Sequence, residues 1–153
     1  MKKNLEQRQL RLIQRMNKSP WLSKAAETLR DQINGAFVGR SRKADGWIGD
    51  SKHSSRKSDH NARPDGEVCA IDIDAGLSDQ QGVSYDLADQ LRLAAKKDKR
   101  ISYIIHAGKI SSPRSLWKFR KYTGINPHHQ HIHISFKPNQ NGKKFDIPLL
   151  KGN

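Results

Sequence analysis

Hydrophobic residues recur every three or four positions in several parts of the chain, a period that is typical of amphipathic helices. The segments with this spacing are residues 5–16, 19–35 and 85–97. In the second segment Ser19 suits the N-terminal cap and Gly35 suits the exit from the helix. The apolar stripe of that segment consists of Leu22, Ala26, Leu29 and Ile33. We expect this stripe to face the core.

Other segments have the alternating character of a half-buried strand. They are residues 67–74 (EVCAIDID), 101–105 (ISYII) and 131–136 (HIHISF), whereas residues 40–66 lack periodicity and predict a long loop. Alternate side chains of a strand point to opposite faces of a sheet. In the last strand the isoleucines would therefore pack inward while the histidines face a cleft. In the first strand the isoleucines would pack inward while the aspartates share the opposite face.

Length and composition limit what the chain can be. Its 153 residues suit a single domain, residues 1–153, with one modest core. The mean hydropathy is −0.88, and no run approaches the roughly 20 apolar residues of a membrane-spanning helix. The basic start MKKNLEQRQ is not followed by the apolar stretch of a secretory signal. The chain has one cysteine, Cys69, which excludes an internal disulfide.

The chain is strongly basic, with a formal net charge of +14 at pH 7. Such a surface attracts polyanions, whether nucleic acid, anionic lipid or wall polymer, without choosing among them. Much of the excess lies in the first third of the chain, where residues 1–18 predict a basic amphipathic helix peripheral to the domain. A solvated basic face without a partner is the alternative.

Four of the seven histidines lie in the short stretch NPHHQHIHISF. His131 and His133 would share the polar face of one strand, and His60, in SDHN, offers a further imidazole. Two histidines and one carboxylate form a recurrent catalytic zinc site. We therefore expect a metal site, with Asp72 and Asp74 as competing carboxylate ligands. A solvent-exposed histidine pair beside a solvent-facing aspartate is the alternative.

The motifs SDHN, GEVCAIDID and HIHISF resemble, in that order, those of zinc peptidases of the D-Ala-D-Ala carboxypeptidase and L-alanyl-D-glutamate endopeptidase type. These peptidases share a fold with the Hedgehog signalling domain. The segments ADGWIGD and WKFRKYTGINPH are similar to a phage-encoded branch of small single-domain endolysins. The resemblance spans residues 29–136. It implies an α+β fold with a small antiparallel sheet, flanking helices and a zinc site in a cleft on the sheet.

The resemblance also implies roles for individual residues. The implied Zn²⁺ ligands are His60, Asp72 and His133. His131 would lie beside the metal and steady the transition state. The position three before the last histidine, often a catalytic acid in the family, is Gln130, whose amide cannot accept a proton at neutral pH. The general base would then be His128 or His131, because imidazole titrates near the operating pH.

On the substrate side, Ser58 and Arg56 would bind stem-peptide carboxylates, with a plain surface charge as the alternative for Arg56. Trp117 would line the groove, with core packing as its alternative. The resemblance implies a zinc metallopeptidase for host-cell lysis, either an L-Ala–D-Glu endopeptidase or a D-Ala–D-Ala carboxypeptidase of peptidoglycan. Such a monomer would be made in the host cytoplasm and reach the periplasm and wall through a holin-type partner. There its basic surface would meet anionic polymers. The alternatives are a basic metal-dependent nuclease or DNA-binding protein, and a non-catalytic zinc module that binds the wall.

Overall fold

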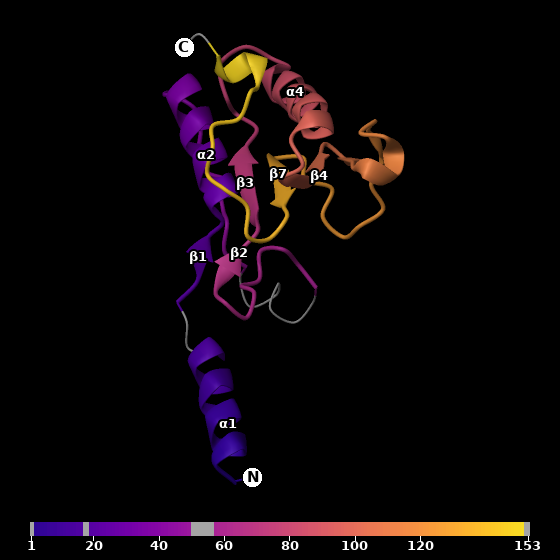
Figure 1. Cartoon of the computed structure of the whole chain (residues 1–153). Coiled ribbons are helices and arrows are strands. Elements are labelled where there is room, and N and C mark those ends of the chain that lie inside the picture. Colours follow the sequence, from indigo (N-terminus) through magenta and orange to yellow (C-terminus); the bar gives the residue numbers. More distant parts are fainter. Residues whose placement is uncertain (1, 17–18, 50–56, 152–153) are drawn as a thin grey trace.

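The computed structural model describes residues 2–16, 19–49 and 57–151, which form an α+β structure around a small antiparallel sheet (Figure 1). The described helices are α1 (Lys2–Met16), α2 (Lys24–Ala36) and α4 (Val83–Lys97), with short 3-10 helices η1 (Pro113–Ser115) and η2 (Pro148–Leu150). The strands of the main sheet are β3 (Ala70–Asp74), β4 (Ile101–His106), β5 (Lys109–Ser111), β6 (Arg120–Lys121) and β7 (His131–Phe136). Their spatial order is β3-β7-β4-β5-β6, and all neighbours are antiparallel. The order brings the two strands with histidines and aspartates side by side.

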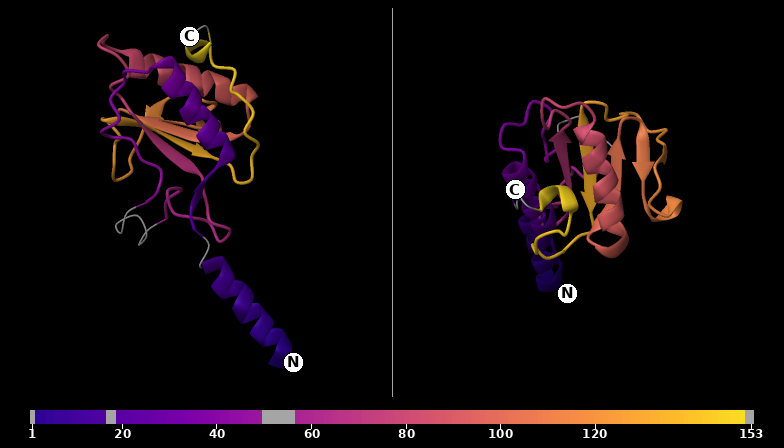
Figure 2. Two further views of the ribbon diagram at one scale, coloured as in Figure 1. Left: turned by 90° about the vertical axis from the view of Figure 1, so that its left-hand side faces the viewer. Right: turned by 90° about the horizontal axis from the view of Figure 1, so that it is seen from above.

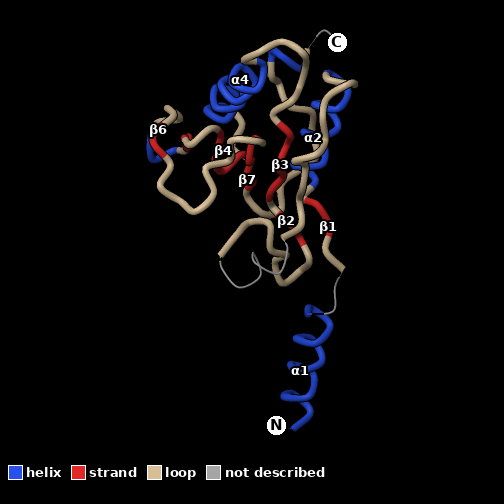
Figure 3. The backbone as a smooth tube through the Cα atoms, turned by 180° about the vertical axis from the view of Figure 1, so that it is seen from behind, coloured by secondary structure: helices blue, strands red, loops and turns tan. Residues whose placement is uncertain are grey.

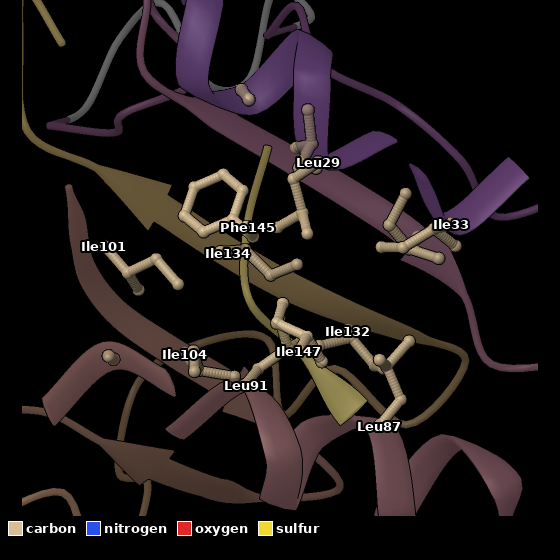
Figure 4. Close-up of a cluster of buried hydrophobic side chains, with 14 of the residues drawn as sticks. Leu29, Ile33, Leu87, Leu91, Ile101, Ile104, Ile132, Ile134, Phe145 and Ile147 are labelled. Carbon is tan, nitrogen blue, oxygen red and sulfur yellow. The ribbon is translucent and has the colours of Figure 1, made fainter. Parts of the chain in front are cut away.

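Helices α2 and α4 cover one face of this sheet, together with the C-terminal segment that ends in η2 (Figure 2). The core lies between these layers (Figure 4). The side chains that fill it include Leu29, Ile33, Leu87, Leu91, Ile132, Ile134, Phe145 and Ile147. The isoleucine side chains of β3 and β7 point into this core. The side chains that alternate with them along the two strands therefore lie on the opposite face of the sheet.

The predicted stripe of residues 22–33 is buried, as expected, but the helix begins later than predicted. Ser23 rather than Ser19 caps α2, and its side chain accepts a hydrogen bond from the Ala26 amide. Before the cap, β1 (Trp21–Leu22) pairs in parallel with β2 (Glu67–Val68). This pairing satisfies backbone groups with a partner more than 40 residues away, which a local pattern does not reveal. Gly35 lies in the last turn of α2, one residue before its end.

The predicted strands are confirmed, although residues 67–74 are divided at Cys69 into β2 and β3. The third predicted helix is also confirmed and starts two residues earlier, at Val83. Strands β5 and β6 were not predicted. They are only three and two residues long, so they are too short to show an alternating pattern.

Helix α1 extends away from the sheet and the other helices (Figure 3). The side chains of residues 3–12 are all exposed, including Leu5, Leu10 and Leu12. A helix with several exposed leucines and a basic polar side has the composition of an interfacial amphipathic helix. In the described part of the chain, we find no helix with the length and apolar content needed to cross a bilayer.

Candidate metal centre

The pairing of β3 with β7 positions the first two groups of the candidate site. Asp72 lies directly opposite His133, and Asp74 opposite His131. Their neighbours Ile71, Ile73, Ile132 and Ile134 are buried in the core on the other side of the sheet. Burial of the isoleucines thus sets the register, and the register places a carboxylate against an imidazole.

His60 comes from the long segment between α2 and β2 and completes the cluster. The loop is tied to β3 by paired backbone hydrogen bonds between Gly46 and Asp72. Nδ1 of His60 lies 2.8 Å from the carbonyl oxygen of Trp47. Because a carbonyl only accepts, Nδ1 carries the proton and Nε2 turns its lone pair to the cluster. Nε2 lies 3.2 Å from Oδ2 of Asp72 and 3.2 Å from Nδ1 of His133.

These three side chains could hold a metal ion. Nδ1 of His133 lies 3.1 Å from Oδ1 of Asp72, so the two imidazole nitrogens are 3.2 Å apart and each lies 3.1–3.2 Å from one of the two carboxylate oxygens. Ligand atoms on a tetrahedron around zinc, with bonds of about 2.0–2.1 Å, are separated by roughly 3.3 Å. The donor set and its spacing therefore suit a divalent ion of the zinc type.

The charges of the cluster reinforce this arrangement. Burial raises the pKa of Asp72, but hydrogen bonds and charge interactions with His133 and His60 outweigh it and hold that pKa well below its usual range. Burial lowers the pKa of His60, but the Asp72 carboxylate and the Trp47 carbonyl outweigh it, so the net shift is upward. Asp72 is therefore an anion at neutral pH and is surrounded by imidazoles, an environment that favours a cation.

His131 and His128 lie next to these three residues. Nε2 of His131 is 3.5 Å from Oδ1 of Asp72. The His128 ring meets the His131 ring edge to face at 4.7 Å and lies 5.2 Å from the His133 ring. Burial, followed by the neighbouring histidines, lowers the pKa of His128 to about 4, and burial also lowers the pKa of His131. Both imidazoles are therefore neutral near pH 7.

A cavity of about 290 Å³ opens beside the cluster, and His60, His128 and His133 line it. Its other walls include Lys57, Ser58, Tyr103, Tyr122 and Asn126. Ser58, which was predicted to contact the substrate, lines this cavity. Its hydroxyl also accepts a hydrogen bond from the His60 amide. The cavity gives a small polar ligand access to the clustered imidazoles.

Two predicted site residues lie elsewhere. Gln130 is exposed and lines a different cavity, with Lys43 and Gly76, because its position just before β7 faces away from His131. Trp117 is 6% exposed and belongs to the hydrophobic core, as its alternative role of core packing requires. Arg56 lies outside the described residues.

Asp74, the competing carboxylate, is occupied by structural hydrogen bonds. Its oxygens accept from the backbone amides of Ala44 and Gly76 and from the Ser41 hydroxyl. Both groups of potential metal ligands among the described residues contain Asp72 and neither contains Asp74. The loop that carries Ala44 therefore decides between two aspartates that strand alternation makes equivalent.

The sequence prediction missed a hydrogen-bonded chain behind His133. Nε2 of His133 lies 2.8 Å from the buried Ser135 hydroxyl, Ser135 bonds to the Tyr103 oxygen, and Tyr103 donates to Asp59 at 2.8 Å. When Nδ1 of His133 carries no proton and turns its lone pair to the cluster, Nε2–H donates a hydrogen bond to the Ser135 hydroxyl. Alternation could have identified Ser135, which shares a face with His131 and His133. Tyr103 could not be identified in this way, because β4 changes register between Ile101 and Tyr103.

No family model matches the chain, and no curated protein or solved structure matches it significantly. The features of the chain that point to a function are its sequence motifs and the cluster of His60, Asp72, His128, His131 and His133.

Proposed function

We propose that this protein is a zinc-dependent peptidase that hydrolyses amide bonds of peptidoglycan stem peptides, of the phage endolysin type, with a Hedgehog/DD-peptidase-like fold. The observation that carries the proposal is the set of His60, Asp72 and His133 beside an open cavity, with the two imidazole nitrogens 3.2 Å apart and each 3.1–3.2 Å from a carboxylate oxygen of Asp72. Catalytic zinc sites commonly use two histidines, one carboxylate and a water.

His60, Asp72 and His133 would hold the ion. Zinc bound there would lower the pKa of its water toward neutrality and polarise the scissile carbonyl. His131 lies 3.5 Å from Asp72 and its pKa is lowered by burial, so its Nε2 would be able to accept a proton as a general base. His128, at the cavity wall, is the second neutral imidazole and the alternative base. Once protonated, either imidazole can stabilise an oxyanion or return the proton to the leaving amine.

The cavity also contains groups that suit an anionic peptide. Lys57 and Ser58 line it, and stem peptides carry free carboxylates. An L-Ala–D-Glu endopeptidase and a D-Ala–D-Ala carboxypeptidase would use the same metal centre, so the bond that is cut stays open within the proposal.

The proposed setting is the host cell wall. A monomer made in the cytoplasm would reach the periplasm with a holin-type release partner. The net charge of +14 and the exposed basic helix α1 would favour contact with anionic wall or outer-membrane polymers.

Mass spectrometry of digested peptidoglycan tests the activity, the bond and the metal together. Wild-type protein should release new amino groups, and a chelator or His133→Ala should abolish the release. Added zinc should restore the chelated wild type but not the variant. The matched control is His129→Ala, an exposed histidine two residues before His131, which should keep full activity. Full digestion by His133→Ala, or in excess chelator, would refute the proposal.

Assays of the same purified protein distinguish the proposed peptidase from two other functions. The high positive charge favours a metal-dependent nuclease or DNA-binding protein, which would show strongly salt-dependent DNA binding or cleavage and no effect on peptidoglycan. Gln130, in place of the family's acid, favours a non-catalytic zinc module that binds the wall. That module would sediment with cell walls and release no amino groups.

A further inference from the structure

Two buried imidazole nitrogens in the cluster are unsatisfied. Nδ1 of His128 and Nε2 of His131 find no hydrogen-bond partner in the part of the chain that the structure describes. The His128 residue is 9% exposed, and the side chain of His131 is 15% exposed. A buried polar atom without a partner costs free energy unless a ligand or water satisfies it. These two nitrogens are therefore free to bind a ligand other than an ion held by His60, Asp72 and His133.

The geometry around these nitrogens resembles that of a ligand set. One nitrogen of each ring and one oxygen of Asp72 all lie within 4.8 Å of one another. The two rings are nearly perpendicular, at 88°, with centroids 4.7 Å apart. Oδ2 of Asp72 faces His60 at 3.2 Å, while Oδ1 lies 3.5 Å from Nε2 of His131. Because Oδ1 also lies 3.1 Å from Nδ1 of His133, the Asp72 carboxylate is within reach of both sets of imidazoles.

We propose that His128, His131 and Asp72 form a second, weaker divalent-cation site, and that its occupation inhibits hydrolysis. The inhibitory part rests on the proposed function, because the second ion would occupy the two imidazoles that serve there in proton transfer. The site is weaker because two cations would share one carboxylate and repel each other at short range. Because two of the three ligands are imidazole nitrogens, the site favours zinc, cobalt, nickel or copper over magnesium and calcium.

Zinc binding to the full chain tests the site without reference to activity. Equilibrium dialysis of the wild type should give two zinc ions per chain, one tight and one at least tenfold weaker. His128→Asn should bind one ion tightly, because asparagine tolerates the positive φ of 58° at this position but does not supply an imidazole. His131→Ala should lose the same weak site, and the exposed neighbour His129→Ala should keep both.

Each outcome decides a separate part of the inference. A wild type that saturates at one zinc overturns the second site, even if zinc-dependent hydrolysis of peptidoglycan is found. A second zinc that persists at wild-type strength in folded His128→Asn and in His131→Ala overturns the assignment of its ligands. Hydrolysis should fall at least tenfold as zinc rises through the range of the weak site. Undiminished hydrolysis with both sites filled overturns the inhibitory role.

Discussion

Removal of the Ser135 hydroxyl should weaken zinc binding without touching a zinc ligand. Ser135 is fully buried, and its oxygen lies 2.8 Å from Nε2 of His133. Zinc needs the lone pair on Nδ1 of His133, so the proton must be on Nε2, where Ser135 accepts its hydrogen bond. In Ser135→Ala that N–H would be buried and unsatisfied whenever zinc is bound.

The magnitude follows from the two states of His133. A buried N–H without an acceptor costs about 1–3 kcal/mol. The zinc-free variant avoids this cost, because the proton can move to Nδ1 and bond to Asp72, 3.1 Å away. The cost therefore falls mainly on the zinc-bound state. We expect the zinc affinity to fall by about 10–100-fold, the usual effect of losing such a supporting bond, which corresponds to about 1.4–2.7 kcal/mol.

Competition against a zinc-binding indicator dye at neutral pH measures this change. Ser111→Ala is the matched control, since the Ser111 hydroxyl is equally buried but has no hydrogen-bond partner among the described residues. It should leave zinc affinity unchanged. An affinity of Ser135→Ala within about twofold of wild type, or an equal loss in Ser111→Ala, would refute the role of the bond between Ser135 and His133.

Three further changes test other parts of the molecule. Trp117→Ala should lower the free energy of unfolding in urea by about 3–5 kcal/mol and leave zinc affinity unchanged; normal stability with weaker wall binding would instead support a substrate contact. Burial raises the pKa of Asp74, but hydrogen bonds from Gly76, Ala44 and Ser41 outweigh it and lower that pKa overall. Its stabilisation is therefore complete above the unfolded pKa of about 3.9 and is lost as pH falls through the lower folded value. Asp74→Asn should be less stable at pH 7 and lose less stability on acidification to pH 2, and parallel pH profiles would contradict this. Removal of residues 1–18 should reduce killing of intact Gram-negative cells more than hydrolysis of purified wall, and equal losses would argue against a membrane-directed helix.

Local periodicity was sufficient for most of the core and for the face of the sheet on which Asp72 and His133 lie, but it did not separate Asp72 from Asp74 or His133 from His131. Alternation in β3 and β7 depends on which face is buried, so it correctly assigned Ile132 and Ile134 to the core and His133 to the opposite face. At two positions the local signal was ambiguous. Two serines precede α2, and the pairing of β1 with β2 leaves Ser23 as the cap. The role of Trp117 was also ambiguous, because an aromatic side chain suits both a groove and a core.

The sequence by itself determined which side chains share a face, because that depends on backbone geometry within a few residues. Only the tertiary structure decided which shared faces meet. It brought His60 from a long aperiodic loop to within 3.2 Å of Asp72, occupied Asp74 with hydrogen bonds from Ser41, Ala44 and Gly76, and turned Gln130 away from the cluster. These outcomes depend on strand register and loop closure between distant segments, and the free energies that set them arise only when those segments pack together.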